Sequence, residues 1–207
     1  MSDLKFYTNP QSRGRIVRWM LEEAGADYDV AMIDYAGGLT SAEYRAVNPM
    51  AKIPAIVHRG KTVTECAAIC AYLADAFPAA GLAPATEDRA DYYRWLFFAA
   101  GPLEQAVTTR AAGWEPAEAQ QRMFGFGTYE RTIDTLEGAV SGLGDRWLTG
   151  NRFTAADLYV GAHLSFGTMF GTIPKRDAFV TFVERVQARP AAIRANELDD
   201  ALAASVA

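Results

Sequence analysis

The stretch NPMAKIPAIV, residues 48–57, decides the fold. Its second half, from Ile53 to Val57, is short and apolar, which is typical of a buried strand. Pro54 interrupts this pattern, because a proline has no N–H for a β-ladder and is normally confined to edges, strand starts and bulges. A proline at the head of an apolar strand is typical of an ordinary edge strand, and the alternative is that something other than a neighbouring strand uses the backbone beside it.

Strand-like and helix-like patterns alternate around this stretch. Upstream, the chain predicts strands at 4–7 and 27–33, a helix that follows Ser12 and stops at Gly25, and a short helix at 41–47. Downstream, it predicts a turn at Gly60, a returning strand at 61–64 and a helix at 65–77 that Pro78 ends. A βαβ unit followed by a ββα unit predicts a four-stranded mixed sheet with helices packed on it.

The rest of the chain is helical in pattern. We expect a first domain at 1–80, a linker at 81–87 and an all-helical domain at 88–207, and therefore an α+β protein. The expected helices are 88–114 (interrupted at Gly101-Pro102), 116–140, 153–171, 175–190 and a last short helix.

Composition excludes several classes of protein. Half of the 207 residues are apolar, so the chain can bury a sizeable core. The net charge of −5 argues against a nucleic-acid partner. No apolar run approaches the length of a membrane helix, and Asp3 and Lys5 lie where a signal peptide would be apolar. The two cysteines are too few for a disulfide framework, which favours a cytoplasmic setting.

Four local motifs lie along the chain in a specific order. They are FYTNPQSRGR (6–15), NPMAKIP (48–54), TEC (64–66) and FTAADLYV (153–160). In this order and spacing they resemble the cytosolic, bacterial-type glutathione S-transferase (GST) family over nearly the whole chain. The resemblance implies a thioredoxin-like first domain, a helical second domain and a homodimer. It also implies glutathione as co-substrate, with no metal or organic cofactor.

The resemblance implies specific contacts to glutathione. The Ile53-Pro54 bond is expected to be cis, so that the backbone of Ile53 pairs with the cysteinyl part of the ligand like a short strand. Glu65 faces the γ-glutamyl ammonium, the N–H of Cys66 takes the γ-glutamyl carboxylate, and Lys52 approaches the glycyl carboxylate. The family usually has Ser where this chain has Cys66, and a thiol is the weaker donor.

Each of these residues also has a purely structural interpretation. Pro54 is then an ordinary edge-strand proline, and Lys52 a solvated loop residue. Thr64 is a helix N-cap and Glu65 a first-turn acid that favours the helix dipole. Cys66 is a structural cysteine on the core face of its helix.

A transferase of this type must ionise the glutathione thiol. Ser12, at the start of the first helix, is the expected hydroxyl donor, with Tyr7 as the alternative. Ser12 is otherwise a simple N-cap. Asn9 and Gln11 are further donors, and Arg13 and Arg15 add positive potential. Residues 8–15 include no cysteine, which argues against disulfide chemistry of the glutaredoxin kind.

The second domain supplies the site for an apolar electrophile in a cleft between the domains, as the resemblance implies. The expected lining residues are Phe98, Arg110 and Trp114. Other aromatic residues of this region are expected mostly in the core: Tyr92, Tyr93, Trp95 and Phe97. Asp157 forms a capping box with Thr154, and this role is structural.

The leading hypothesis is therefore a detoxifying glutathione transferase whose thiolate attacks a small hydrophobic electrophile. Two alternatives remain open at this stage. One is a protein that keeps the fold for docking or regulation without turnover, and the other is a glutathione-dependent peroxidase that uses the same thiolate. Neither His58 nor His163 has an evident chemical partner, and no metal site is expected.

Overall fold

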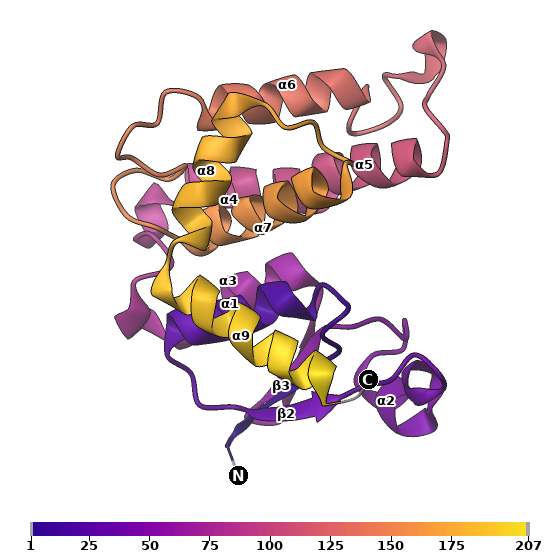
Figure 1. Ribbon diagram of the computed structural model, residues 1–207, viewed down its shortest axis with the longest axis vertical. Helices are drawn as coiled ribbons and strands as arrows, with labels where there is room; N and C mark the ends of the chain where they lie inside the picture. The colour runs from indigo at the N-terminus through magenta and orange to yellow at the C-terminus, as the bar shows by residue number, and fades with distance from the viewer. Residues whose placement is uncertain (1, 206–207) are drawn as a thin grey trace. The chain divides into compact units, whose positions relative to one another are not determined.

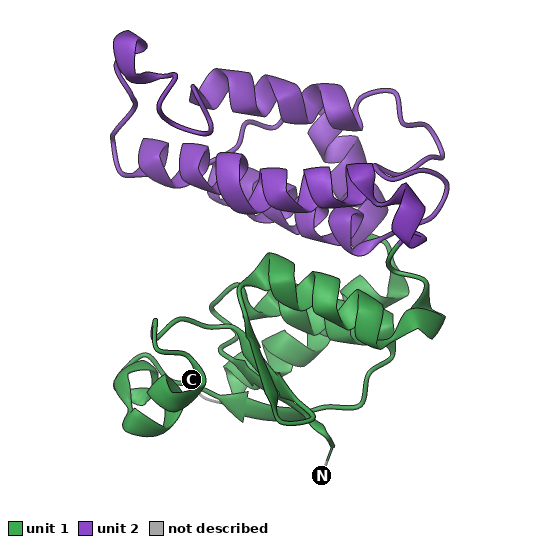
Figure 2. Ribbon diagram, turned by 180° about the vertical axis from the view of Figure 1, so that it is seen from behind, with its two compact units in different colours: residues 1–83, 188–207 green, residues 84–187 purple. Residues whose placement is uncertain are grey.

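The computed structural model describes residues 2–205, which form two compact units. Unit 1 holds the chain up to Ala83 together with the segment from Ala188 onward, and unit 2 holds Pro84–Gln187 (Figure 2). The last helix therefore groups with the N-terminal sheet, although the sequence places it in the helical domain. Within unit 1 this helix packs on the first helix, and ion pairs join the two segments.

Unit 1 contains a four-stranded sheet in the order β2-β1-β3-β4. Figure 1 labels two of its strands, β2 and β3. The strands are β1 Leu4–Thr8, β2 Asp29–Met32, β3 Ala55–His58 and β4 Lys61–Thr64. The first two are parallel and the other neighbours are antiparallel, so the predicted mixed sheet is confirmed. The helices are α1 Gly14–Ala24, α2 Ala42–Val47, α3 Cys66–Ala76 and α9 Pro190–Ala204, with 3-10 turns at Gly38–Thr40 and Pro78–Ala80.

The core of unit 1 lies between the sheet and the helices α1 and α3. Alternate residues of β1 are buried, as a strand with one face on a core requires. They meet the apolar stripes of the two helices, which repeat every three or four residues. The fully buried members include Phe6, Ile56, Ile16, Met20, Ile69 and Leu73.

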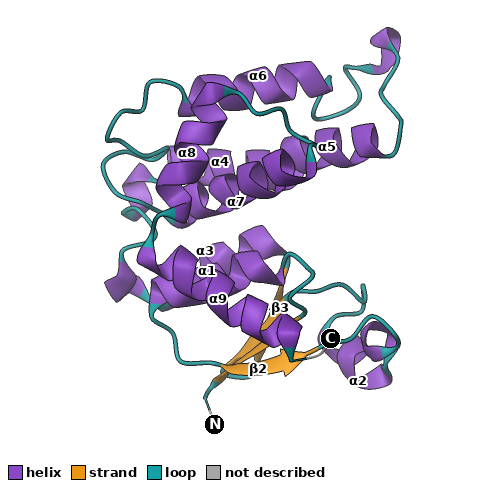
Figure 3. Cartoon of the chain, viewed as in Figure 1, coloured by secondary structure: helices purple, strands orange, loops and turns teal. Residues whose placement is uncertain are grey.

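Unit 2 consists of helices joined by loops, and its described residues include an isolated β-bridge between Trp147 and Gly150 (Figure 3). Its helices are α4 Ala90–Phe98, α5 Glu104–Ala111, α6 Tyr129–Val140, α7 Ala155–Phe170 and α8 Asp177–Gln187, with 3-10 turns at Thr86–Asp88 and Glu118–Gln120. Together the two units confirm the predicted α+β class. Within residues 2–205, no helix has the length and apolar character that spanning a membrane requires.

The interruption predicted at Gly101-Pro102 is confirmed. A π-helical turn, Ala99–Leu103, separates α4 from α5 and contains Pro102. Proline cannot donate the usual helical hydrogen bond, and a wider turn accommodates its ring.

Three sequence expectations are wrong in detail. The predicted helix at 116–140 begins only at Tyr129, because Gly127 has a φ of 65° and Thr128 then caps α6. The last helix is not short, since α9 has 15 residues and begins with Pro190 at a first-turn position that suits proline. β3 begins at Ala55, so the proline at residue 54 precedes the strand instead of interrupting it.

The aromatic residues of α4 divide between two faces. Tyr92 and Trp95 are buried, as predicted. Tyr93 and Phe97 are 43% and 70% exposed, so the expectation that they belong to the core is wrong. Helical geometry explains the division, because positions 92, 95, 96 and 99 share one face and positions 93 and 97 lie on another.

Candidate functional site

Strand register brings three predicted segments to one end of the sheet. Ala55 pairs with Tyr7 of β1 on one side and with Thr64 of β4 on the other. β1 ends one residue after Tyr7, β4 ends at Thr64, and β3 starts at Ala55. One edge of the sheet is therefore formed by the end of β1, the start of β3 and the end of β4. At this edge lie the loop after β1, the Ile53–Pro54 segment and Glu65. This is the edge at which the sequence predicts the ligand.

Ser12 lies in the loop between β1 and α1, one residue before the N-cap position, which Arg13 occupies. The Ser12 hydroxyl donates to the carbonyl oxygen of Asn9 over 2.6 Å and accepts from the N–H of Gly14 over 2.9 Å. The N–H of Ser12 also donates to the Asn9 carbonyl, over 3.1 Å. The half-buried hydroxyl thus stands at the start of α1, where the helix dipole favours an anion.

Asn9 anchors this loop. Its side-chain Nδ2 donates to the carbonyl of Ile33 beyond β2 over 3.0 Å, and its Oδ1 accepts from the N–H of Gln11 over 2.9 Å. The Asn9 side chain is buried, so its amide serves the loop instead of standing free as the ligand donor that the sequence allowed. Gln11 is exposed.

Gly14 allows the loop to pass close to the end of β1. A Cβ at this position would lie 1.9 Å from Oγ1 of Thr8 and 3.0 Å from Oγ of Ser12. Thr8 is fully buried, and its hydroxyl has no hydrogen-bond partner among the described residues. Only glycine therefore fits here without moving Thr8 or Ser12.

The peptide bond between Ile53 and Pro54 is cis. The carbonyl of the preceding residue, Lys52, is held by the Tyr44 hydroxyl over 2.6 Å and by Nδ2 of Asn48 over 2.7 Å. These two bonds hold the backbone on the N-terminal side of Ile53. Lys52 is exposed.

The rings of Tyr44 and Tyr7 lie next to each other. Their ring centroids are 5.7 Å apart, and the ammonium of Lys5 lies 5.0 Å from the centroid of Tyr7. Burial raises the pKa of Tyr44 to about 12, so its hydroxyl remains protonated and keeps donating to the Lys52 carbonyl at neutral pH.

Glu65 occupies the N-cap position of α3, a position that the structural interpretation assigned to Thr64. Its φ of 66° is unusual for a residue other than glycine, and such outliers cluster at functional sites. Cys66 opens α3, and its thiol lies 3.8 Å from the carbonyl oxygen of Arg13, which brings the starts of α1 and α3 together. Cys70 is buried one turn later, and burial raises the pKa of its thiol.

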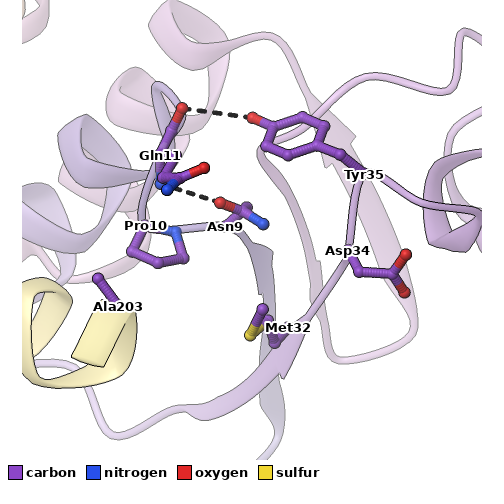
Figure 4. Close-up of a pocket in the computed structure, with 7 residues that line it drawn as sticks. All are labelled: Asn9, Pro10, Gln11, Met32, Asp34, Tyr35 and Ala203. Atoms are coloured by element: carbon purple, nitrogen blue, oxygen red, sulfur yellow. Dashed lines mark hydrogen bonds between the residues drawn. The ribbon is translucent and has the colours of Figure 1, made fainter. Parts of the chain in front are cut away.

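A pocket of about 200 Å³ lies beside the loop that carries Ser12 (Figure 4). Asn9, Pro10 and Gln11 line one side, and Asp34 and Tyr35 line another. Figure 4 also shows the Tyr35 hydroxyl bonded to the Gln11 carbonyl, over 3.4 Å. The lining is completed by Met32 and Ala203.

The residues predicted for the electrophile lie in unit 2. Arg110 forms ion pairs with Glu130 over 2.7 Å and with Glu115 over 3.3 Å, and these bonds raise the pKa of its guanidinium. Trp114 packs edge-on against Phe124, with ring centroids 5.0 Å apart. Phe98, the third predicted residue, lies at the end of α4, and its ring packs edge-on against Trp95.

The two histidines each lie close to a polar side chain, one in unit 1 and the other in unit 2. Nδ1 of His58 lies 3.0 Å from the Tyr72 hydroxyl, and Nδ1 of His163 lies 3.9 Å from a carboxylate oxygen of Glu104. Within residues 2–205, no three His, Cys, Asp or Glu side chains are grouped so that they could hold a metal ion.

Sequence reasoning missed two residues that shape the site. Tyr44 and Asn48 fix the Lys52 carbonyl, yet neither stood out as a site residue. The Asn48-Pro49 dipeptide is a turn signal that marks the start of this loop. The contact of Tyr44 had no local signal, because it depends on how α2 packs against the loop.

Comparisons with known proteins agree with this arrangement. The family model described as "Glutathione S-transferase, N-terminal domain" matches residues 2–75. Over 207 aligned residues, the chain is 26% identical to glutathione S-transferase GstA of Escherichia coli, covering 97% of this chain and 98% of that protein. Over 166 residues, it is 30% identical to glutathione S-transferase 2 of Schizosaccharomyces pombe, covering 73% of this chain and 70% of that protein.

The solved structures include similar proteins. The structure of a sphingomonad glutathione S-transferase complexed with glutathione has a TM-score of 0.75 to this chain. It is 26% identical in sequence and covers 95% of this chain and 98% of that one. The N-terminal family model, the full-length bacterial relative and this structural similarity confirm the resemblance that the four motifs indicated. The chain belongs to the glutathione S-transferase family.

Proposed function

We propose that this protein is a glutathione transferase that ionises the glutathione thiol and directs it at an apolar electrophile. The observation that carries the proposal is the strand register, which gathers the Ser12 loop, Ile53–Pro54 and Glu65 at one edge of the sheet. The sphingomonad relative described above binds glutathione on the same fold.

Glutathione would lie along this edge in an extended conformation. Its cysteinyl backbone would pair with the backbone of Ile53, in the manner of an added strand. The γ-glutamyl end would lie at the start of α3, with its carboxylate on the N–H of Cys66 and its ammonium facing Glu65. Lys52 would approach the glycyl carboxylate.

Thiolate formation would depend on Ser12 and the start of α1. A free thiol of the cysteine type has a pKa of about 8.5, and lowering it by about 2 units requires about 2.7 kcal/mol of selective stabilisation of the anion. To donate to a thiolate, the Ser12 hydroxyl must leave the Asn9 carbonyl. That carbonyl keeps a second donor, the N–H of Ser12, so the exchange leaves no orphaned acceptor. A charge-assisted hydrogen bond then replaces a neutral one.

The electrophile would bind in the helical domain. We assign Phe98, Arg110 and Trp114 to its site on the basis of the family resemblance. Arg110 already satisfies two carboxylates, so in this role its aliphatic stem would pack on the electrophile while its charge remains paired.

We further propose a cytoplasmic homodimer. Tyr93 and Phe97 form an exposed aromatic face on α4, with ring centroids 6.5 Å apart. Large exposed apolar side chains grouped on one helix are typical of a protein–protein interface. The occupant we propose is a second copy of this chain.

Calorimetric titration tests the proposal. Glutathione is titrated at neutral pH in two buffers of different ionisation enthalpy, and S-methylglutathione, which has no ionisable thiol, is the matched control. We expect both ligands to bind and only glutathione to release a proton. A screen of halogenated aromatics and peroxides then separates conjugation from peroxidase activity.

A second function has one specific observation in its favour. The Ser12 hydroxyl is already engaged with Asn9, as expected if the loop were only structural. In that case the protein would bind glutathione, or a partner, without turnover. Glutathione binding without proton release would favour this docking or regulatory function over the transferase.

A further inference from the structure

The last helix is held on α1 by a series of ion pairs. Within unit 1, Figure 1 shows α9 alongside α1. The pairs run in opposite directions along the two segments, so the helices are antiparallel. They are Arg15–Asp200 at 2.6 Å, Arg18–Asp199 at 2.7 Å, Arg194–Glu22 at 2.8 Å and Arg189–Glu23 at 2.6 Å.

One of these pairs also reaches the loop that carries Ser12. Arg15 donates from Nε to the carbonyl of Pro10 over 2.7 Å and from Nη2 to the carboxylate of Asp200 over 2.6 Å. These two N–H groups lie on the same edge of the planar guanidinium, so fixing one fixes the direction of the other. Arg15 therefore connects α9 to the loop.

We propose that Asp200 is a positioning residue that holds the Ser12 loop through Arg15. The inference rests on the proposed function, because the position of Ser12 matters to catalysis only if Ser12 activates the thiol. Asp200 itself touches neither glutathione nor the thiol in this assignment.

The place of Pro10 in the loop explains how the effect reaches Ser12. Pro10 directly follows Asn9, whose carbonyl binds both the hydroxyl and the N–H of Ser12. The Pro10 carbonyl belongs to the peptide unit that directly follows the Asn9 carbonyl, so a displacement of Pro10 moves the chain next to the acceptor that orients the hydroxyl. The loop is also bonded by Asn9 to Ile33, by Tyr35 over a long 3.4 Å, and by the Cys66 thiol, which lies 3.8 Å from the Arg13 carbonyl.

The pocket beside the loop provides a second observation. Ala203, in the last turn of α9, lines the pocket together with Pro10 (Figure 4). The end of α9 thus approaches the loop independently of the Arg15–Asp200 pair. Because the side chain of Asp200 is 69% exposed, the pair contributes little to overall stability, and its effect is expected to be local.

The experiment compares Asp200→Asn with Arg194→Gln in the full chain. Both remove one partly exposed ion pair between α9 and α1, but only Asp200 connects to the loop. Amide hydrogen exchange is followed at Ser12 and Gly14, whose N–H groups are bonded inside the loop. We expect exchange to accelerate about twofold to fivefold in Asp200→Asn, a range typical of losing one exposed ion pair, and to stay at the wild-type rate in Arg194→Gln.

Kinetics with glutathione give the catalytic readout. In Asp200→Asn, the pH profile of kcat/KM should shift to higher pH while the KM for glutathione stays constant, and Asp200→Glu should restore the profile. In an Arg15→Ala background, Asp200→Asn should add nothing, because the connection is already lost.

The outcomes separate this inference from the proposed function. Equal exchange rates in Asp200→Asn and Arg194→Gln would overturn the positioning role. A shift in exchange without a shift in the pH profile would overturn its link to catalysis. If the wild type neither binds nor ionises glutathione, the proposed function fails, and the exchange rates still decide whether Asp200 holds the loop.

Discussion

The Ser12 hydroxyl donates a hydrogen bond of 2.6 Å to the carbonyl oxygen of Asn9, three residues earlier in the chain. This bond holds the hydroxyl at the start of α1, and the proposed role in thiol activation requires the hydroxyl to turn away from the Asn9 carbonyl. The Asn9 carbonyl would still be satisfied by the N–H of Ser12. The loop thus presents a donor whose release leaves no buried acceptor unpaired.

Replacing Ser12 with Ala should raise the apparent pKa of the bound glutathione thiol and lower kcat/KM at neutral pH. A hydrogen bond to a charged group contributes about 1.5–3 kcal/mol, so the loss should be about tenfold to a hundredfold. The pH dependence of conjugation measures both quantities. Tyr7→Phe is the matched control, and a larger loss in that variant than in Ser12→Ala would transfer the role to Tyr7.

Replacing Cys66 with Ser should strengthen glutathione binding. A hydroxyl is a better donor than a thiol at the start of α3, where the γ-glutamyl carboxylate is proposed to lie. We expect the Kd to fall about threefold, consistent with a net gain below about 1 kcal/mol per neutral hydrogen bond. Calorimetry measures the Kd, and an unchanged Kd would rule out a contact between the Cys66 side chain and the ligand.

The second cysteine provides the control for that exchange. Cys70 is fully buried, so Cys70→Ser places a hydroxyl in an apolar core. It should lower the melting temperature and leave glutathione affinity unchanged. Opposite behaviour of the two variants would show that only Cys66 faces the ligand.

Replacing Gly14 with Ala should destabilise unit 1. The new methyl group would lie 1.9 Å from Oγ1 of Thr8, and such overpacking typically costs about 1–3 kcal/mol. Thr8→Ala removes that oxygen, so the double variant should recover part of the loss. Denaturant unfolding measures the four free energies of this mutant cycle.

A glycine with open surroundings serves as the reference for Gly14. Gly138 lies in α6, and a Cβ added there would meet nothing within 4 Å. Gly138→Ala should therefore be neutral or stabilising by up to about 1 kcal/mol. Equal effects at both glycines would rule out the steric explanation.

Asp157 should make folding stability depend on pH. Burial raises the pKa of its carboxyl from 3.8 to about 6, against the bonds that it accepts from Leu148 and Thr154. The folded state therefore binds the proton more tightly than the unfolded state. The contribution of Asp157 to the free energy of unfolding is largest below its unfolded pKa, falls as pH rises through about 6, and is level above that.

Two variants isolate this effect. Asp157→Asn removes the titration and keeps only one acceptor oxygen for the N–H groups of Leu148 and Thr154, so one of them loses its partner, which costs about 1–3 kcal/mol at all pH values. The difference in unfolding free energy between wild type and variant should shrink as pH rises from about 4.5 to 7. Asp177→Asn, at an exposed acid in the first turn of α8, is the control for the loss of one carboxylate outside the core. A difference that grows with pH would mean that the pKa is lowered by folding.

Replacing Phe97 with Asp should dissociate the proposed dimer. The ring is 70% exposed in the single chain, and a charge in its place would have to be buried between two copies. Sedimentation at several concentrations should show a monomer. Met123→Asp, at a side chain that is 79% exposed elsewhere in unit 2, should remain dimeric, and equal mass for both variants would place the interface elsewhere.

Local sequence signals predicted much of unit 1 correctly. The strand at 61–64 and the helix that begins at the TEC motif were placed to within one residue, because Gly60 and the apolar stripe define them locally. The helix expected at 116–140 was wrong over its first half, because Pro116, Gly125 and Gly127 outweigh the weak periodicity there.

The candidate site likewise combines features that local motifs predict with features that depend on long-range contacts. The sequence alone was enough to identify the Ser12 loop, the Ile53–Pro54 segment and Glu65 as candidate site segments. Each of them belongs to a contiguous motif, which is recognised from neighbouring residues in the chain. Tertiary structure decided that Tyr44 holds Lys52, that Asn9 is an anchor, and that α9 belongs with the sheet. The Arg18–Asp199 pair joins residues 181 positions apart, and no local pattern encodes a contact at that separation. Such contacts form because burying a charge is costly unless an opposite charge meets it, and only the folded chain brings the two together.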